Sequence, residues 1–233
     1  MYLKNYQKIF KVVIQMLLVS VLMCSSICKA VEIRIYKFET RSSFSPHGVK
    51  SKKPEGKKFW YKDKDKWQSF DFSSGDARIS YSGEKNFVVY KKTGEGMQDN
   101  AFVPMSSIAL PVGNEVFILM QKSNSAIAFY PLSVSPDRLP KGDLVFMNMT
   151  SRVLAIKFGK NQKVLRTNKF GVFATDKETK ANPLVYIAAK VAGKWEIAYK
   201  SLLTCAEAKR SIVVIYDSSK TEFPSLNVNV IQF

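Results

Sequence analysis

The sequence predicts an all-β protein with two tandem small β-sandwich domains after an N-terminal signal peptide. Three observations support this fold class. Apolar and polar residues alternate in many short segments, as in residues 31–38, where Val31, Ile33 and Ile35 share one face. Gly, Pro, Asn or Asp separates these segments at short intervals, which is typical of sandwiches and barrels. The second part of the chain also repeats the segment pattern of the first.

The first 30 residues have the three regions of a secretory signal peptide. Three lysines precede an apolar stretch at residues 12–23, and small residues follow up to Ala30. The stretch is shorter than the roughly 20 residues of a spanning helix, and no later apolar run reaches that length. We therefore expect cleavage after Ala30, export to the periplasm or the extracellular space, and no transmembrane segment in the mature chain.

Two alternatives to a cleaved signal peptide stay open. A lipoprotein signal would use Cys24, but Met23 before it is larger than the residues such signals prefer. An uncleaved membrane anchor is disfavoured by the length of the apolar stretch.

The remaining chain contains strand-like segments almost throughout. Residues 57–72 hold two short runs around a charged turn, and residues 198–210 also permit a short helix. The other predicted strands lie within residues 31–38, 77–82, 86–92, 101–110, 115–122, 126–134, 144–151, 153–159, 163–168, 171–176, 184–193, 194–204, 211–218 and 226–233.

A Pro-containing break at residues 135–143, SPDRLPKGD, predicts a linker between two domains. The predicted division is a signal at 1–30, a first sandwich at 31–135 and a second at 142–233. Residues 86–134 and 184–233 share one pattern: two strands joined by a Gly-containing turn, then a strongly apolar strand, a Ser-rich turn and an alternating strand. Two similar β-domains of about 100 residues each fit this repeat.

Charge and cysteine content restrict the partners. The formal net charge is +17, carried by 29 lysines and only seven arginines. Lysine is a hydrated point charge, so this surface predicts diffuse attraction to polyanions. For an exported protein an anionic polysaccharide or an envelope protein is a better partner than nucleic acid. Of three cysteines only Cys205 lies beyond the signal, so the mature chain has no intramolecular disulfide and depends on its apolar core.

The sequence lacks the motifs of most enzymes. There is one histidine, His47, and no G-x-S-x-G elbow. One histidine and one mature cysteine cannot form a His/Cys zinc site, and lysines interleave the acids at Asp63 and Asp65. We expect no catalytic residue, no metal and no cofactor. A polymer hydrolase stays open as an alternative, through His47 beside Ser45 or through a carboxylate pair.

The predicted binding site is the hairpin at residues 57–72. A two-residue turn at Asp63-Lys64 would set Trp60 opposite Trp67 on the polar face. This face would also carry Lys58 and Lys62. Flat aromatic side chains beside lysines can stack on acidic sugars. The alternative is that these tryptophans cover the edge of the core, and Trp195 is interpreted as core or as a domain contact.

Three short stretches resemble a group of uncharacterised exported bacterial proteins of the kind found in verrucomicrobial genomes. They are YSG at residues 81–83, the strand FMNMTS at 146–151 after Gly142, and GKW at 193–195. The resemblance implies the two-domain sandwich layout and brings no known activity. More remotely, the layout is similar to accessory proteins of periplasmic alginate acetylation, which would imply an accessory role in the envelope.

These observations predict an exported noncatalytic β-sandwich protein that binds an anionic glycan or an envelope partner. The alternatives are the extracellular polymer hydrolase and a structural component of the cell surface, which would expose open strand edges.

Overall fold

The computed structural model describes residues 30–39, 58–73, 75–122, 127–176, 179, 183–203, 208–218 and 225–233. Residues 1–29 of the predicted signal peptide, His47 and Cys205 lie outside these residues. Among the residues described, no helix has the length and apolar character needed to cross a membrane.

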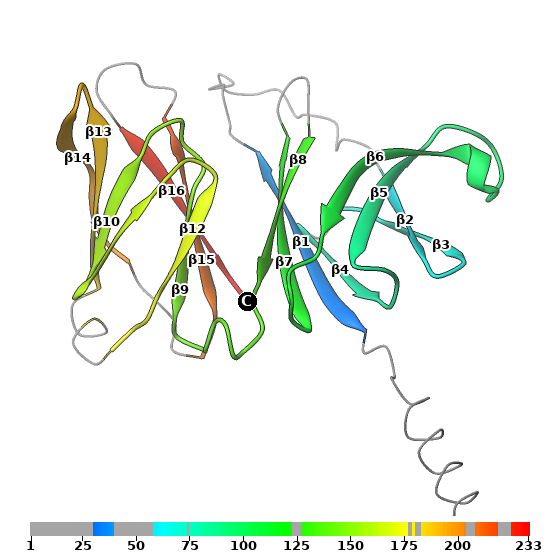
Figure 1. Cartoon of the computed structure of the whole chain (residues 1–233), viewed down its shortest axis with the longest axis horizontal. Helices are drawn as coiled ribbons and strands as arrows, with labels where there is room; N and C mark the ends of the chain where they lie inside the picture. The colour runs from blue at the N-terminus through cyan, green and yellow to red at the C-terminus, as the bar shows by residue number, and fades with distance from the viewer. Residues whose placement is uncertain are drawn as a thin grey trace, which may run out of the picture.

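The described chain is all-β, which confirms the predicted fold class (Figure 1). Its strands overlap the segments predicted from alternation and turn residues, although β11 and β12 each begin two residues before the predicted segment. They are β1 (Val31–Glu39), β2 (Phe59–Asp63), β3 (Lys66–Phe70), β4 (Asp76–Tyr81), β5 (Asn86–Lys92), β6 (Phe102–Ala109), β7 (Glu115–Lys122), β8 (Ile127–Ser133), β9 (Leu144–Asn148), β10 (Leu154–Phe158), β11 (Asn161–Leu165), β12 (Lys169–Phe173), β13 (Leu184–Val191), β14 (Lys194–Leu202), β15 (Ser211–Asp217) and β16 (Leu226–Gln232). A 3₁₀ turn, η1 (Asp99–Ala101), precedes β6.

The strands form four sheets of four strands. Sheet A has the order β4-β1-β7-β8 and sheet B the order β3-β2-β5-β6. Sheet C has the order β12-β9-β15-β16 and sheet D the order β11-β10-β13-β14. The two halves of the chain therefore share one topology, in which each strand of the first half corresponds to the strand eight places later.

Pairing direction and irregularities repeat as well. In each half the only parallel pair among the described strands joins the first strand to the seventh, as β1–β7 and β9–β15. The register slips at the same place, between Val89 and Tyr90 in one half and between Ile187 and Ala188 in the other. A β-bulge is a specific local feature, so its repetition shows that the halves match in detail and not only in strand number.

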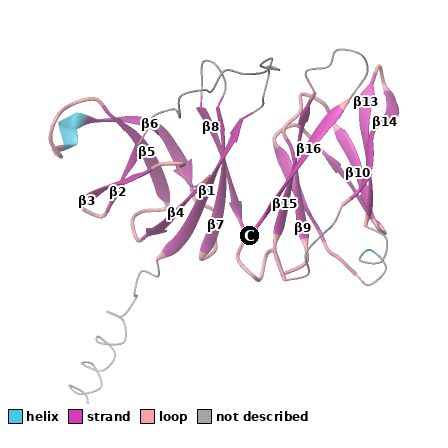
Figure 2. Ribbon diagram, turned by 180° about the vertical axis from the view of Figure 1, so that it is seen from behind, coloured by secondary structure: helices cyan, strands magenta, loops and turns pink. Residues whose placement is uncertain are grey.

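Three apolar cores hold the sheets together. One core lies between sheets A and B, around Phe87 and Ile118, and a second lies between sheets C and D, around Phe146 and Phe158. The third core joins the other face of sheet A to the other face of sheet C, with Phe117 fully buried there. The sheets consequently stack in four layers, in the order B, A, C, D (Figure 2).

This stacking explains the most apolar segments of the sequence. In β7, Val116, Ile118 and Met120 face the first core, whereas Phe117 and Leu119 face the third. β9 and β15 divide their side chains between the second and third cores in the same way. A strand buried on both faces needs apolar residues at consecutive positions, because successive side chains point to opposite sides.

Candidate functional site: the aromatic–lysine face of sheet B

The β2–β3 hairpin has a different register from the predicted one. Its turn is Lys64-Asp65, with Lys64 at φ 53°, so Asp63 pairs with Lys66 and Lys62 pairs with Trp67. Trp60 therefore lies opposite Ser69, and the prediction that it faces Trp67 is wrong.

Core packing sets this register. Phe59 and Phe70 become direct partners with stacked rings 5.5 Å apart, and both are buried between sheets A and B. An aromatic cross-strand pair of this kind stabilises one alignment of two strands over its neighbours. The Asp63 carboxylate also accepts a hydrogen bond from the backbone N–H of Ser82 at 2.8 Å, which holds Asp63 in the strand.

The alternation places the predicted site residues on the outer face of sheet B. Since Phe59 and Tyr61 point into the core, Trp60 and Lys62 point to the opposite side. Trp67 lies on that side as the direct partner of Lys62, and Lys58, just before β2, is exposed. The predicted set therefore shares one face of the sheet although the detailed register differs.

The two tryptophans pack on residues that the sequence interpretation missed. The Trp67 ring stacks on Phe102 at 3.8 Å between centroids with an interplanar angle of 17°. Tyr90 meets the same indole edge-on at 4.9 Å, and Trp60 lies tilted against Phe102 at 5.3 Å. Phe102 itself is 6% exposed, so it forms a rigid base beneath the half-buried Trp67.

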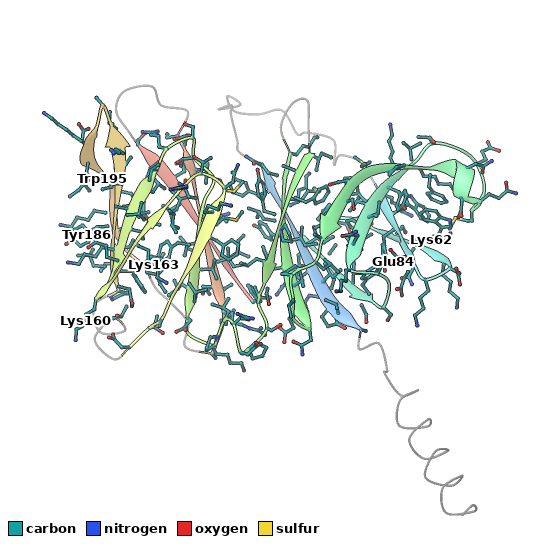
Figure 3. All side chains as sticks on the ribbon, in the orientation of Figure 1. Lys62, Glu84, Lys160, Lys163, Tyr186 and Trp195 are labelled. Carbon is teal, nitrogen blue, oxygen red and sulfur yellow. The ribbon has the colours of Figure 1, made fainter. Side chains whose placement is uncertain are left out.

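Two lysines complete the face. The Lys62 ammonium lies 5.6 Å from the centre of the Trp67 ring, and the Lys92 ammonium lies 5.4 Å from the centre of the Trp60 ring. Cations at these distances are attracted by the negative faces of the rings. Figure 3 shows Lys62 on the sheet B side of the molecule.

Asp99 links Lys62 to Trp67. The Trp67 indole Nε1–H donates to Asp99 Oδ1 at 2.8 Å, and Lys62 Nζ donates to both carboxylate oxygens at 3.0 and 2.8 Å. These bonds from Lys62 and then from Trp67 lower the pKa of Asp99, and the bond to Asp99 raises the pKa of Lys62. Both groups are therefore charged at neutral pH, and the indole is held in one orientation.

The segment between β5 and β6 brings Asp99 into place. Thr93 N–H and Gly94 N–H both donate to the Ala101 carbonyl, at 2.9 and 3.3 Å, and Ala101 is buried. A Cβ at Gly94 would lie only 3.2 Å from the Ala101 Cα, a tight contact, so this close return of the chain favours a glycine. We name the resulting surface the aromatic–lysine face; it consists of Trp60, Lys62, Trp67, Tyr90, Lys92, Asp99 and Phe102.

The structure places Trp195 differently from the sequence interpretation. Trp195 lies on β14 and is 47% exposed at the end of the molecule opposite to Lys62 (Figure 3), so its interpretation as core or domain contact is wrong. In the part of the chain that the structure describes, no three His, Cys, Asp or Glu side chains gather as metal ligands.

Comparisons with known proteins found no match to this chain among protein-family models or among curated proteins.

Proposed function

We propose that the protein is an exported, noncatalytic binding protein that holds an acidic saccharide on the aromatic–lysine face of sheet B. The observation that carries the proposal is the Trp67 indole, which is supported from behind by Phe102 and oriented by Asp99 beside two lysines.

The geometry suits a uronic acid unit. Pyranose rings present flat patches of C–H groups, which pack on exposed indole faces, and the buried Phe102 means that Trp67 loses little conformational freedom on binding. Lys92 would attract the sugar carboxylate, since the charge of Lys62 is already paired with Asp99, and the Asp99 oxygens can accept hydrogen bonds from hydroxyl groups. Because half-exposed charges attract from a distance but are screened by salt, stacking must supply the specificity.

The test is binding of polyguluronate, polymannuronate and neutral dextran to the full chain by calorimetry at low and moderate salt. Trp67→Ala should weaken binding of the acidic polymers roughly tenfold or more, because it removes about 1.5–3 kcal/mol of apolar contact. Trp195→Ala is the matched control and should leave the affinity unchanged.

Two outcomes would contradict the proposal. Equal binding by wild type and Trp67→Ala, with loss of both at moderate salt, would identify nonspecific attraction to the 29 lysines instead of a site. Release of new reducing ends during incubation would establish the polymer hydrolase alternative.

A further inference from the structure

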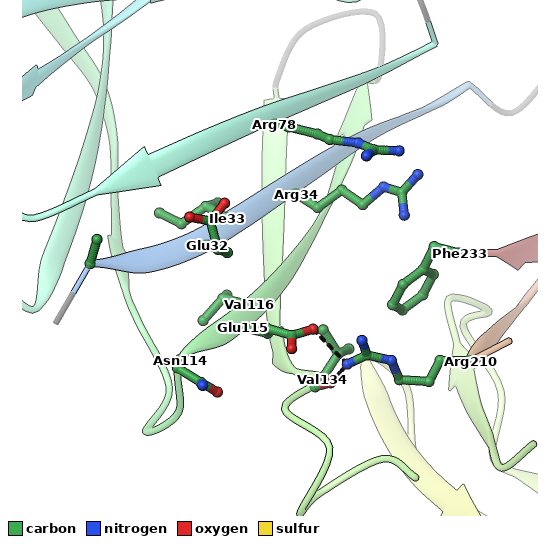
Figure 4. Close-up of a pocket in the computed structure, with 11 residues that line it drawn as sticks. Glu32, Ile33, Arg34, Arg78, Asn114, Glu115, Val116, Val134, Arg210 and Phe233 are labelled. Carbon is green, nitrogen blue, oxygen red and sulfur yellow. Dashed lines mark hydrogen bonds and ion pairs between the residues drawn. The ribbon is translucent and has the colours of Figure 1, made fainter. Parts of the chain in front are cut away.

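A second surface lies where sheets A and C separate at the start of β1. Twisted sheets packed face to face diverge toward their corners, and here the apolar third core gives way to polar side chains. The result is an open pocket with a cavity volume of about 440 Å³. Its lining includes Glu32, Arg34, Arg78, Glu115, Arg210 and Phe233 (Figure 4).

Arginine is rare in this chain but frequent in the lining of this pocket. Three of the seven arginines of the whole chain line it, and they come from both sandwiches. Arg34 on β1 and Arg78 on β4 are direct cross-strand partners, an arrangement of like charges that costs free energy without a nearby anion.

One carboxylate group beside these two arginines partly offsets the repulsion. The Arg34 Nε donates to Asp76 Oδ2, and the Arg78 Nε lies 3.6 Å from the same oxygen. The trio keeps one net positive charge. Arg78 lines the pocket and is 72% exposed in its side chain, so its guanidinium group is open to solvent.

The opposite wall is fixed and neutral. Arg210, only 16% exposed in its side chain, pairs with Glu115 at 2.6 Å and donates to the Val134 carbonyl. The Phe233 ring lies between the guanidinium carbons of Arg34 and Arg210, which are 5.2 and 5.6 Å from its centre. Phe233 also stacks on Phe117 at 5.5 Å between ring centroids, so this wall places a half-buried aromatic ring next to the positive pair.

We propose that this pocket binds a small organic monocarboxylate. Its carboxylate bridges the guanidinium groups of Arg34 and Arg78, and its apolar body packs toward Phe233. The planar fork of arginine matches a carboxylate in two parallel hydrogen bonds. The formal charges of Arg34, Arg78 and Arg210 are balanced by those of Asp76, Glu32 and Glu115, so the pocket is neutral overall and disfavours a dianion such as phosphate.

The test uses sodium benzoate as the probe and benzamide, its neutral isostere, with the full chain in calorimetry and in ¹⁵N NMR of arginine side chains. Benzoate should bind at millimolar or tighter affinity and shift the Arg78 resonance, whereas benzamide and inorganic phosphate should bind at least tenfold more weakly. Arg78→Gln should weaken benzoate about tenfold, and Arg78→Lys should fall between.

The matched control is Arg138→Gln. Arg138 has a similar exposure, 65%, and lies at a similar distance, 3.7 Å, from Asp137, but it is not part of the pocket lining. This variant should bind benzoate as wild type does. No saturable benzoate binding up to about 10 mM, equal binding of benzamide, or equal loss in the Arg78 and Arg138 variants would each overturn the proposal. Saccharide binding at sheet B tests a different surface, so the two proposals can fail independently.

Discussion

The outer faces of sheets B and D occupy equivalent positions in the two halves, and they are filled differently. Trp60 and Ala155 hold equivalent positions, because each is the second residue of its strand and each pairs with the corresponding residues of the two neighbouring strands. By the same comparison of registers, Trp67 corresponds to Gln162. The same registers relate Tyr90 to Ala188 and Phe102 to Trp195. Two lysines occur in both halves, as Lys62 with Lys157 and Lys92 with Lys190.

This difference distinguishes the residues that the sandwich fold requires from those that it does not require. Sheet D builds the same four-stranded layer with alanines at Ala155 and Ala188, so the aromatic residues on sheet B are not required by the fold. Sheet D lacks these aromatic neighbours, and Trp195, which corresponds to the buried Phe102, is 47% exposed there. The comparison therefore favours a binding role for the aromatic cluster of sheet B.

The largest expected effect is on stability. Phe102→Ala should lower the free energy of unfolding by about 3 kcal/mol, because a buried phenylalanine leaves a cavity beneath Trp67 and Trp60. Trp195→Ala at the equivalent position should cost about 0.5 kcal/mol, since its ring is half exposed. Urea unfolding followed by circular dichroism measures both. Equal losses in the two variants would mean that the two faces are not packed differently.

A smaller effect is expected when the second face is made to resemble the first. Gln162→Trp would place an indole beside Trp195, as Trp67 lies beside Phe102, and an offset aromatic pair should raise the free energy of unfolding by about 1 kcal/mol. Gln162→Ala is the control for loss of the amide and should change stability by less than half as much. A destabilised Gln162→Trp variant would contradict the equivalence of the two positions.

The sequence alone predicts the strands well because each one depends on local signals. Turn residues separate the segments, and alternation or a short apolar run marks each strand between them, including β5–β8 and β13–β16, the segments of the predicted repeat. The stacking of sheets A and C leaves a signal too, in runs such as VFILM at residues 116–120, but a search for period-two alternation passes over such runs.

The sites depend on contacts between distant segments, and here sequence interpretation has less to use. It places Trp60, Lys62 and Trp67 on one face, because that follows from period two and a two-residue turn, whether the turn is at residues 63–64 or 64–65. The hairpin register follows from the Phe59–Phe70 pair, and the partner Asp99 comes from a turn outside the hairpin. The paired arginines of the pocket lie 44 residues apart in the sequence and become neighbours only through the β1–β4 register.

The smallest expected effect is a local titration that distinguishes the two faces. The pKa of Asp99 is lowered in the folded protein, so its bonds to Trp67 and Lys62 are present above the ordinary carboxyl pKa of about 3.9 and are lost as the pH falls through the lower folded value. The indole N–H resonance of Trp67 should therefore be constant from pH 7 to about pH 4 and should move only below it.

Trp195, which has no hydrogen-bond partner for its indole among the described residues, should show no such step. Asp99→Asn should abolish the step at Trp67. A midpoint at or above the ordinary carboxyl pKa, or an unchanged step in Asp99→Asn, would show that Asp99 does not hold the indole in solution, and the rigid stacking surface on sheet B would lose its main support.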